Sequence, residues 1–158
     1  MPARYERHHL RDMSECISTS SAPIPVASYP HARRVGNLLF LSGVGPRKAG
    51  SGNGDNVVPG LELNKSGEVV KFDFEAQVHA VFSNVKAVLN ASGSSWDELI
   101  DVTVFLVNME RDLKTFNRIY AEYFPGDSEN RPCRTTVEVN CLPTPIAIEL
   151  KCIATVNK

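Results

Sequence analysis

Several features that define special classes of protein are missing from this sequence of 158 residues. No apolar run comes near the roughly 20 residues of a membrane-spanning helix, and the N-terminus lacks the apolar segment of a secretory signal. The net charge is −1, so no general attraction to nucleic acid or to an anionic membrane is expected. These absences predict a cytoplasmic protein that binds neither, in which any anion site is a local cluster of cations.

Cysteine is scarce and widely spaced. The cysteines are Cys16, Cys133, Cys141 and Cys152, and no CxxC pair or Cys/His ligand spacing occurs. The spacing therefore predicts no metal site, and reduced thiols fit the cytoplasm. Cys133, Cys141 and Cys152 lie in or beside predicted strands, where we expect them to be small buried hydrophobic residues.

The length and composition fit one globular domain. Hydrophobic residues make up 42% of the sequence, which is enough to build one core of useful size. Residues 1–21 show no hydrophobic periodicity, so a flexible N-terminal tail is predicted there, followed by a single domain over residues 22–158. Gly, Asn, Asp and Ser are frequent in residues 46–60, a predicted loop long enough for a role near a site.

Two amphipathic helices and a strand form the middle of the chain. Asp73 is the predicted N-cap of the first helix and Gly93 its end. Ser95–Glu98 matches a capping box, Ile100–Val107 is a β-branched strand, and Asp112 is the predicted cap of the second helix. The apolar stripes are Phe74, Val78, Val81, Phe82, Val85, Val88 and Leu89 in the first helix, and Leu113, Phe116, Ile119, Tyr120, Tyr123 and Phe124 in the second.

The predicted order of elements is strands, helix, strand, helix, strands. It begins with a hairpin in which Gly36-Asn37 joins Val35 to residues 38–42. The simplest packing is an α+β fold, a single mixed β-sheet with two helices packed on one face. The other face carries apolar residues, so a symmetric oligomer is the economical way to cover it.

Two further strands end the chain. Residues 135–139 alternate after Pro132, and residues 146–152 alternate after a turn containing two prolines. If these strands pair as a hairpin, the Arg134 guanidinium lies within reach of the Glu149 carboxylate. From chemistry alone, a structural ion pair at the end of a sheet is an equally good interpretation.

Three groups of motifs resemble the RidA/YjgF family of enamine/imine deaminases, over about residues 22–156. They are Ser28-Tyr-Pro-His31 with Leu41-Ser-Gly43, then Phe116-Asn-Arg-Ile-Tyr-Ala-Glu-Tyr-Phe124, and finally Arg134-Thr-Thr-Val-Glu-Val with Ile148-Glu-Leu-Lys-Cys-Ile-Ala154. The resemblance implies a chorismate-mutase-like fold and a homotrimer with its sites at subunit interfaces.

The resemblance also implies roles for individual residues. The family arginine that matches Arg134 grips the substrate carboxylate, and the glutamate that matches Glu149 positions or activates water. Tyr29 and Ser42-Gly43 line the family's pocket, and Asn117 matches a further pocket position.

Within the family, the sequence most resembles the 2-aminomuconate deaminases, in the Tyr29–Gly36 and Phe105–Met109 segments. Housekeeping members often have cysteine where this chain has Thr136, a pocket position, and a shorter segment in place of residues 46–60. The resemblance therefore implies hydrolytic deamination of 2-aminomuconate to a 2-oxo diacid and ammonia, in aromatic or tryptophan-type catabolism. This reaction needs no electron sink, so no cofactor is expected.

Two alternative functions stay open. The chain can be a generalist that deaminates 2-aminoacrylate or 2-iminopropanoate, or a non-catalytic trimer that binds small carboxylates. A diacid substrate also needs a second cation or donor beside Arg134. The candidates for that role are His31, Arg33, Arg34 and Arg47.

Overall fold

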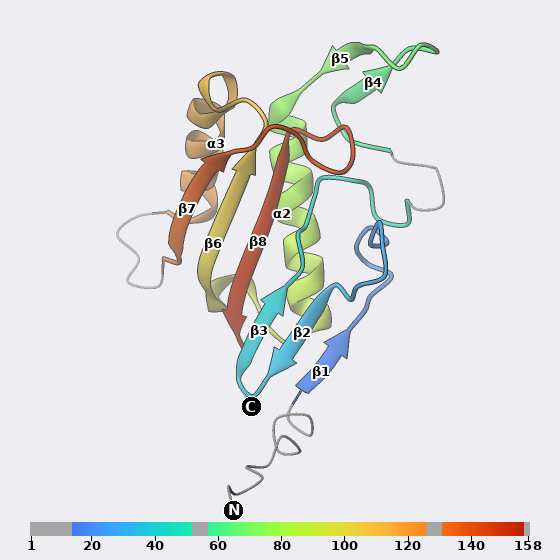
Figure 1. The fold of residues 1–158 in the computed structure, drawn as a ribbon. Coiled ribbons are helices and arrows are strands. Elements are labelled where there is room, and N and C mark those ends of the chain that lie inside the picture. Colours follow the sequence, from blue (N-terminus) through green and yellow to red (C-terminus); the bar gives the residue numbers. More distant parts are fainter. Residues whose placement is uncertain (1–13, 52–56, 126–130, 157–158) are drawn as a thin grey trace, which may run out of the picture.

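The computed structural model describes residues 14–51, 57–125 and 131–156. Its main sheet has the strand order β1-β2-β3-β8-β6-β7 (Figure 1). These strands are β1 (Ser14–Ile17), β2 (Ala32–Val35), β3 (Leu38–Leu41), β6 (Leu99–Leu106), β7 (Cys133–Glu138) and β8 (Ile148–Thr155). β6 and β7 are parallel and the other neighbouring strands are antiparallel, so the sheet is mixed.

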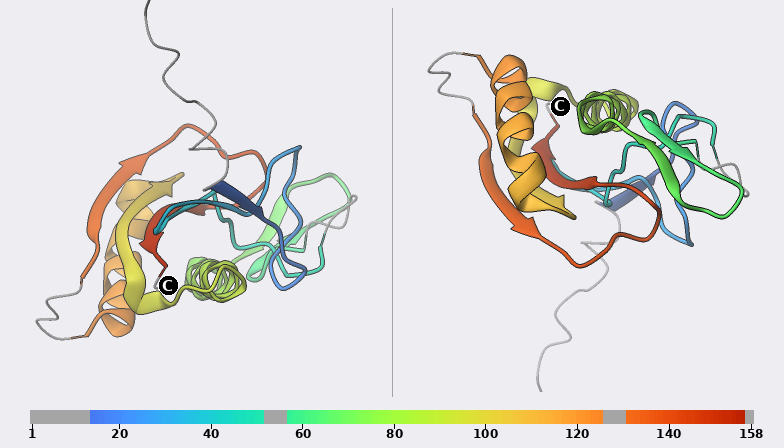
Figure 2. Two further views of the ribbon diagram at one scale, coloured as in Figure 1. Left: turned by 90° about the horizontal axis from the view of Figure 1, so that it is seen from below. Right: turned by 90° about the horizontal axis from the view of Figure 1, so that it is seen from above.

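Both α-helices of the described residues lie on the same face of this sheet (Figure 2). They are α2 (Phe74–Ala91) and α3 (Met109–Tyr123), and the short 3₁₀ helix η1 (Trp96–Glu98) precedes β6. The predicted α+β architecture, a mixed sheet with two helices on one face, is confirmed. Neither of these helices has the length and apolar character needed to cross a membrane.

The caps of the two helices differ from prediction at one position. Asp73 caps α2 as predicted, and its side chain accepts a hydrogen bond from the Ala76 N–H at 3.0 Å. The predicted Asp112 cap of α3 is wrong, because Asn108 caps this helix one turn earlier by accepting from the Arg111 N–H at 2.9 Å. Asp112 is instead buried and accepts two hydrogen bonds from the Arg111 guanidinium.

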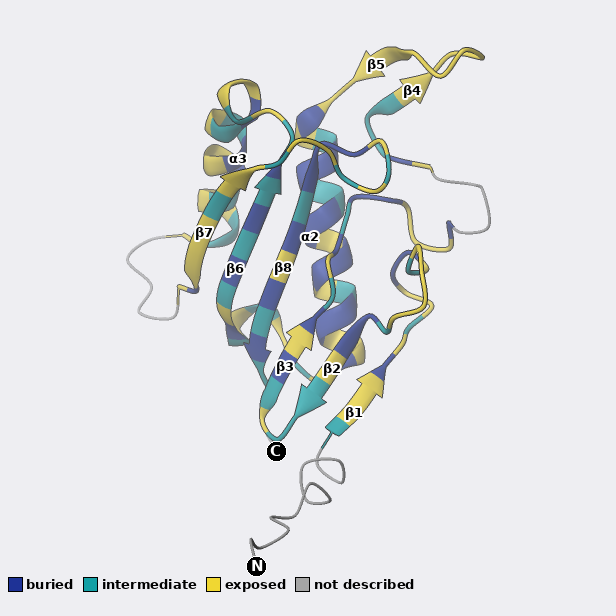
Figure 3. Cartoon of the chain, viewed as in Figure 1, coloured by how far each residue is buried: buried dark blue, intermediate teal, exposed yellow. Residues whose placement is uncertain are grey.

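Alternate side chains of the central strands build the core (Figure 3). The buried residues are Val102, Val104 and Leu106 of β6, and Ile148, Leu150, Cys152 and Ala154 of β8. Cys152 is thus buried as predicted, but the prediction is wrong for Cys133 and Cys141, which are exposed. Cys133 begins the edge strand β7 and lies on the face of the sheet that the helices do not cover, because its neighbour Arg134 pairs with Val102 on the helix face.

Two described segments form strands that the sequence did not predict. Ser14–Ile17, part of the predicted tail, forms β1 and pairs antiparallel with β2. Residues 1–13 of that tail lie outside the described residues, as do residues 52–56 of the predicted loop. β4 (Leu61–Leu63) and β5 (Val69–Phe72) form a separate two-stranded sheet.

The last two strands do not form the predicted hairpin. β6 lies between them, parallel to β7 and antiparallel to β8. The connection between Glu138 and Ile148 therefore crosses from one side of β6 to the other (Figure 1). This arrangement separates Arg134 from Glu149.

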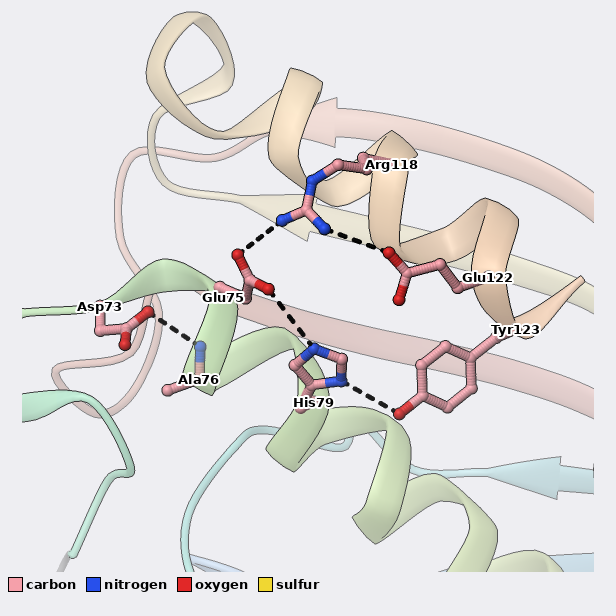
Figure 4. Close-up of polar contacts among 7 residues, drawn as sticks. All are labelled: Asp73, Glu75, Ala76, His79, Arg118, Glu122 and Tyr123. Atoms are coloured by element: carbon pink, nitrogen blue, oxygen red, sulfur yellow. Dashed lines mark hydrogen bonds and ion pairs between the residues drawn. The ribbon is translucent and has the colours of Figure 1, made fainter.

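Polar contacts join the exposed sides of the two helices (Figure 4). Arg118 of α3 forms ion pairs with Glu75 of α2 at 2.5 Å and with Glu122 at 3.1 Å. His79 of α2 lies 3.1 Å from the Tyr123 hydroxyl of α3. Because these ion pairs are exposed, they contribute little to stability, and the helices depend on their apolar contacts.

Substitution of Phe82 in α2 tests whether the packing of the helices depends on apolar contacts. Phe82 is fully buried, with its ring centroid 4.6 Å from that of Tyr123 and 5.4 Å from that of Trp96. We expect Phe82→Ala to lower the free energy of unfolding by about 3–5 kcal/mol, because it removes these contacts and leaves a cavity. Urea denaturation measures the change. Val70→Ala is the control, since Val70 is 62% exposed, and equal losses in both variants would contradict this description of the core.

Candidate active site

A cavity of about 350 Å³ lies where the loop before β2, the end of β3 and the start of β8 meet. Its lining includes four of the predicted site residues, Tyr29, Ser42, Gly43 and Glu149. We call these four the cavity group. The structure thus brings residues of the N-terminal and C-terminal motifs into one pocket.

Glu149 projects from the face of the sheet that the helices leave open. Its neighbours Ile148 and Leu150 are buried on the helix face, so the alternation of a strand places Glu149 on the other face. Burial raises the pKa of Glu149, and the positive charge of Arg47 lowers it in part. A carboxylate that is destabilised in this way accepts a proton more readily than an exposed one.

Gly43 lets the Glu149 side chain approach the backbone closely. A Cβ atom on Gly43 would stand 2.8 Å from Cδ of Glu149, which is too close for two carbon atoms. The approach occurs where Ser42 and Gly43 interrupt the pairing of β3 with β8, just before the isolated bridge between Val44 and Leu150. A side chain at position 43 would therefore displace the Glu149 carboxyl group from this place.

Ser42 and His31 hold the loop that forms one wall of the cavity. The Ser42 hydroxyl donates to the Pro30 carbonyl at 2.7 Å. His31 is buried, its Nε2 donates to the Pro23 carbonyl at 2.9 Å, and its Nδ1 accepts from the Thr19 N–H at 3.2 Å. Both ring nitrogens are engaged, so the structure speaks against His31 as the predicted substrate ligand.

Two cations line the cavity, Arg47 and Lys151. Arg47 is one of the four candidates for the second carboxylate, whereas Lys151 was missed, although its spacing of two residues from Glu149 places it on the same face. Arg33 donates a hydrogen bond to the Ser14 hydroxyl of β1 instead, and Arg34 donates one to the Gly36 carbonyl in the β2–β3 turn. Within the described ranges, no cluster of three His, Cys, Asp or Glu side chains could hold a metal ion.

Arg134 lies away from this cavity. It pairs with Val102 of β6, which pairs on its other side with Cys152 of β8. Val102 and Cys152 face the helices, and Arg134 does the same, with its guanidinium carbon 4.8 Å from the ring centroid of Tyr120. Glu149 points to the opposite face, so the predicted contact between Arg134 and Glu149 within one chain is wrong.

Arg134 belongs to a second polar group on β7 and α3. Among the described residues, Thr136 Oγ1 and the Tyr120 hydroxyl are buried and have no hydrogen-bond partner. Burial raises the pKa of Tyr120, and the charge of Arg134 lowers it in part. Asn117 is exposed, one helical turn before Tyr120. We call these four residues the edge group; of them, sequence reasoning had placed Tyr120 only in the apolar stripe of its helix.

Comparisons with known proteins identify relatives along nearly the whole domain. The sequence model of the family described as Endoribonuclease L-PSP matches residues 19–156. A RutC family protein of Pyrococcus horikoshii is 39% identical over 142 residues, which cover 90% of this chain and 98% of that protein. The chloroplastic Reactive Intermediate Deaminase A of Arabidopsis thaliana is 36% identical over 141 residues, which cover 89% of this chain and 65% of that protein.

Solved structures share the fold. The YjgF gene product of E. coli superimposes with a TM-score of 0.72 at 28% identity, covering 89% of this chain and 98% of that one. E. coli TdcF with bound serine gives a TM-score of 0.74 at 26% identity, covering 90% and 99%. With a family match over residues 19–156, these relatives show that the chain belongs to the Endoribonuclease L-PSP family, which includes the RutC and RidA/YjgF proteins that its motifs resemble.

Proposed function

We propose that this protein is a hydrolytic deaminase of small enamines and imines that carry a carboxylate. The observation that carries the proposal is the Glu149 carboxyl, partly buried with a raised pKa, in the wall of a cavity that two cations also line. Membership of a family with a relative named Reactive Intermediate Deaminase A supports the same reaction class.

The proposed reaction is a sequence of proton transfers around one addition of water. The enamine takes up a proton from solvent on carbon and becomes an iminium ion, the protonated imine. A water molecule hydrogen-bonded to Glu149 attacks the imine carbon and gives its proton to the carboxylate. The carboxyl group returns this proton to the amino nitrogen of the resulting carbinolamine. The C–N bond then breaks and releases ammonia, while the carbinol O–H gives its proton to the Glu149 carboxylate and the carbonyl of the 2-oxo product forms. Glu149 finally returns that proton to solvent. In this scheme Tyr29 donates a hydrogen bond to the substrate, and no cofactor takes part.

A neighbouring subunit supplies Arg134 in this proposal. Within one chain Arg134 faces away from the cavity, on the edge strand β7. Every residue of β7 except Thr136 is exposed, and an edge strand leaves backbone groups unpaired. A cyclic homotrimer that sets the edge group of one subunit against the cavity group of the next gives Arg134 a bidentate contact with the substrate carboxylate.

The proposed substrate is 2-aminomuconate, in the cytoplasm, on the strength of the subgroup motifs in the sequence. E. coli TdcF is described with bound serine, a small molecule with one carboxylate. That ligand supports a small-carboxylate site in the family, and it fits the generalist deaminase and the non-catalytic binder as well. Activity on defined substrates separates these alternatives.

The first prediction concerns turnover. Purified protein is expected to release ammonia from 2-aminomuconate faster than from 2-iminopropanoate, each generated enzymatically in the assay. Glu149→Gln is expected to lower kcat by about 10²–10⁴-fold, because the amide cannot accept the proton of water. A wild-type protein inactive on both compounds would leave only the binding function, and a fully active Glu149→Gln variant would remove Glu149 from the mechanism.

The raised pKa of Glu149 predicts how kcat/KM depends on pH. Because burial raises the pKa of Glu149, its carboxylate form is lost at a higher pH than that of an ordinary glutamate. We expect kcat/KM to fall as the pH decreases through this raised pKa, and the fall to be absent from the residual activity of Glu149→Gln. An identical acidic limb in both proteins would assign the titration to another group.

Substitution of Gly43 is expected to reduce activity and to leave the fold intact. Gly43→Ala is expected to lower kcat by up to about 100-fold, because the new methyl group displaces the Glu149 carboxyl. Gly67→Ala is the control: Gly67 has a positive φ and open space around it in the distant β4–β5 sheet, so its replacement strains the backbone and leaves the cavity intact. Kinetic assays with circular dichroism compare the two variants, and full activity of Gly43→Ala would contradict the close approach.

Mixed oligomers test the subunit arrangement. Arg134→Ala and Glu149→Gln are each expected to be nearly inactive alone. In a random mixture of the two chains, about a quarter of the sites in a cyclic trimer receive the intact arginine from one chain and the intact glutamate from its neighbour. Co-refolding followed by the ammonia assay should therefore restore about that share of wild-type activity. No recovery, in a mixture shown to contain mixed trimers, would place both residues in the same chain's site.

A further inference from the structure

Arg47 is a buried cation in the wall of the cavity. Its exposed fraction is 9%, and it lines the cavity together with Glu149. One guanidinium nitrogen, Nη2, donates to the Ile24 carbonyl at 2.6 Å. The ion pairs found among the described residues do not include Arg47. Glu149 lines the same cavity and feels the charge of Arg47, but no ion pair joins the two. Since a buried charge is costly unless it is paired, this arrangement favours an anion brought by a ligand.

The backbone around Arg47 is fixed in place. Asn84 of α2 is buried, and its side-chain amide donates to the carbonyl of Gly45 at 2.9 Å and to the carbonyl of Arg47 at 2.8 Å. The segment after β3 is therefore held against the helix before any ligand arrives. A guanidinium has five N–H donors, so bonding to Ile24 leaves donors for a ligand in the cavity that it lines.

The side chains that line the cavity carry an excess of one positive charge. Arg47 and Lys151 contribute two positive charges against the one negative charge of Glu149. Lys151 is exposed and its Nζ donates to the Leu41 carbonyl at 3.3 Å, so Arg47 is the more rigid of the two cations. Arg134 of a neighbouring subunit would raise the excess to two positive charges, which two carboxylates balance.

We propose that Arg47 binds a second carboxylate of the substrate and so makes this site selective for diacid enamines and imines over monoacid ones. The inference rests on the proposed function, because it assigns a specificity residue to the cavity in which Glu149 acts. In this arrangement the neighbour's Arg134 holds the carboxylate next to the reacting carbon, and Arg47 holds the distal one. Planar guanidinium groups suit both contacts, since each can bind a carboxylate through two parallel N–H bonds.

Kinetics with a matched pair of substrates test the proposal. An amino acid oxidase generates 2-iminoadipate from 2-aminoadipate and 2-iminopropanoate from alanine in the same assay. Arg47→Met is expected to lower the diacid-to-monoacid ratio of kcat/KM by about 10- to 100-fold, as for a lost charge-assisted contact. The ratio cancels any effect on Glu149, which acts on both substrates. Arg33→Met, which removes an exposed cation outside the cavity, should leave the ratio unchanged.

Arg47→Lys keeps the charge and loses the fork of donors, so a smaller fall in the ratio is expected. It also replaces Arg47→Met in these assays if loss of the Ile24 contact prevents that variant from folding. An unchanged ratio in the folded variant, with hydrolysis intact, would overturn the role of Arg47 and leave the deaminase assignment standing.

Binding of unreactive acids separates the two proposals. Calorimetry compares adipate with hexanoate, which has the same number of carbons and one carboxylate. Binding of adipate to the wild-type protein is expected to be tighter, and Arg47→Met should remove most of that difference. Arg47-dependent binding of adipate in a protein that hydrolyses no imine would overturn the deaminase and support the diacid site. Equal binding of both acids to the wild type would overturn the diacid site.

Discussion

Alternation of side chains along the three central strands decides which residues of this protein can meet. β6 lies between β7 and β8, and its pairing fixes Arg134 on the helix face and Glu149 on the open face. Two strand spacings of about 4.8 Å each, together with the sheet itself, separate the two side chains. No change of rotamer overcomes that separation in a single chain. In the proposed function the edge group and the cavity group are two half-sites, and the proposed chemistry depends on assembly.

The sequence motifs named residues that the structure brings into one cavity, but they did not predict which strands lie beside one another. Tyr29, Ser42, Gly43 and Glu149 line one cavity although more than a hundred residues separate the first from the last. The hairpin prediction failed because two consecutive strands joined by a proline-containing segment resemble a hairpin in sequence, and only the tertiary fold shows that β6 separates them. The order of the strands in the sheet, and not the residue types of β7 and β8, therefore decided whether these two strands pair.

Other differences between the predicted and the observed structure also have local causes. His31 carries a side chain suited to binding anions, yet two backbone groups of the loop before β2 occupy both of its nitrogens. Asp112 is a good capping residue, but Asn108 stands one turn earlier and begins the helix. β1 pairs through its backbone and has only four residues, in which polar Ser14 and Glu15 precede apolar Cys16 and Ile17, so no apolar alternation marked it. For His31 and Asp112, a hydrogen bond that the sequence does not reveal determined the result.

Asn84 connects the helix layer to the chemistry in front of the sheet. One amide on a buried face of α2 donates to two carbonyls of the segment that carries Arg47. A residue that does not line the cavity therefore holds part of the cavity wall in position. Attempts to evolve new selectivity in this scaffold should therefore include the inner face of α2. Substitution of Asn84 there would shift the segment that carries Arg47 and so change the direction of its guanidinium group. The residues that line the cavity would themselves stay unchanged.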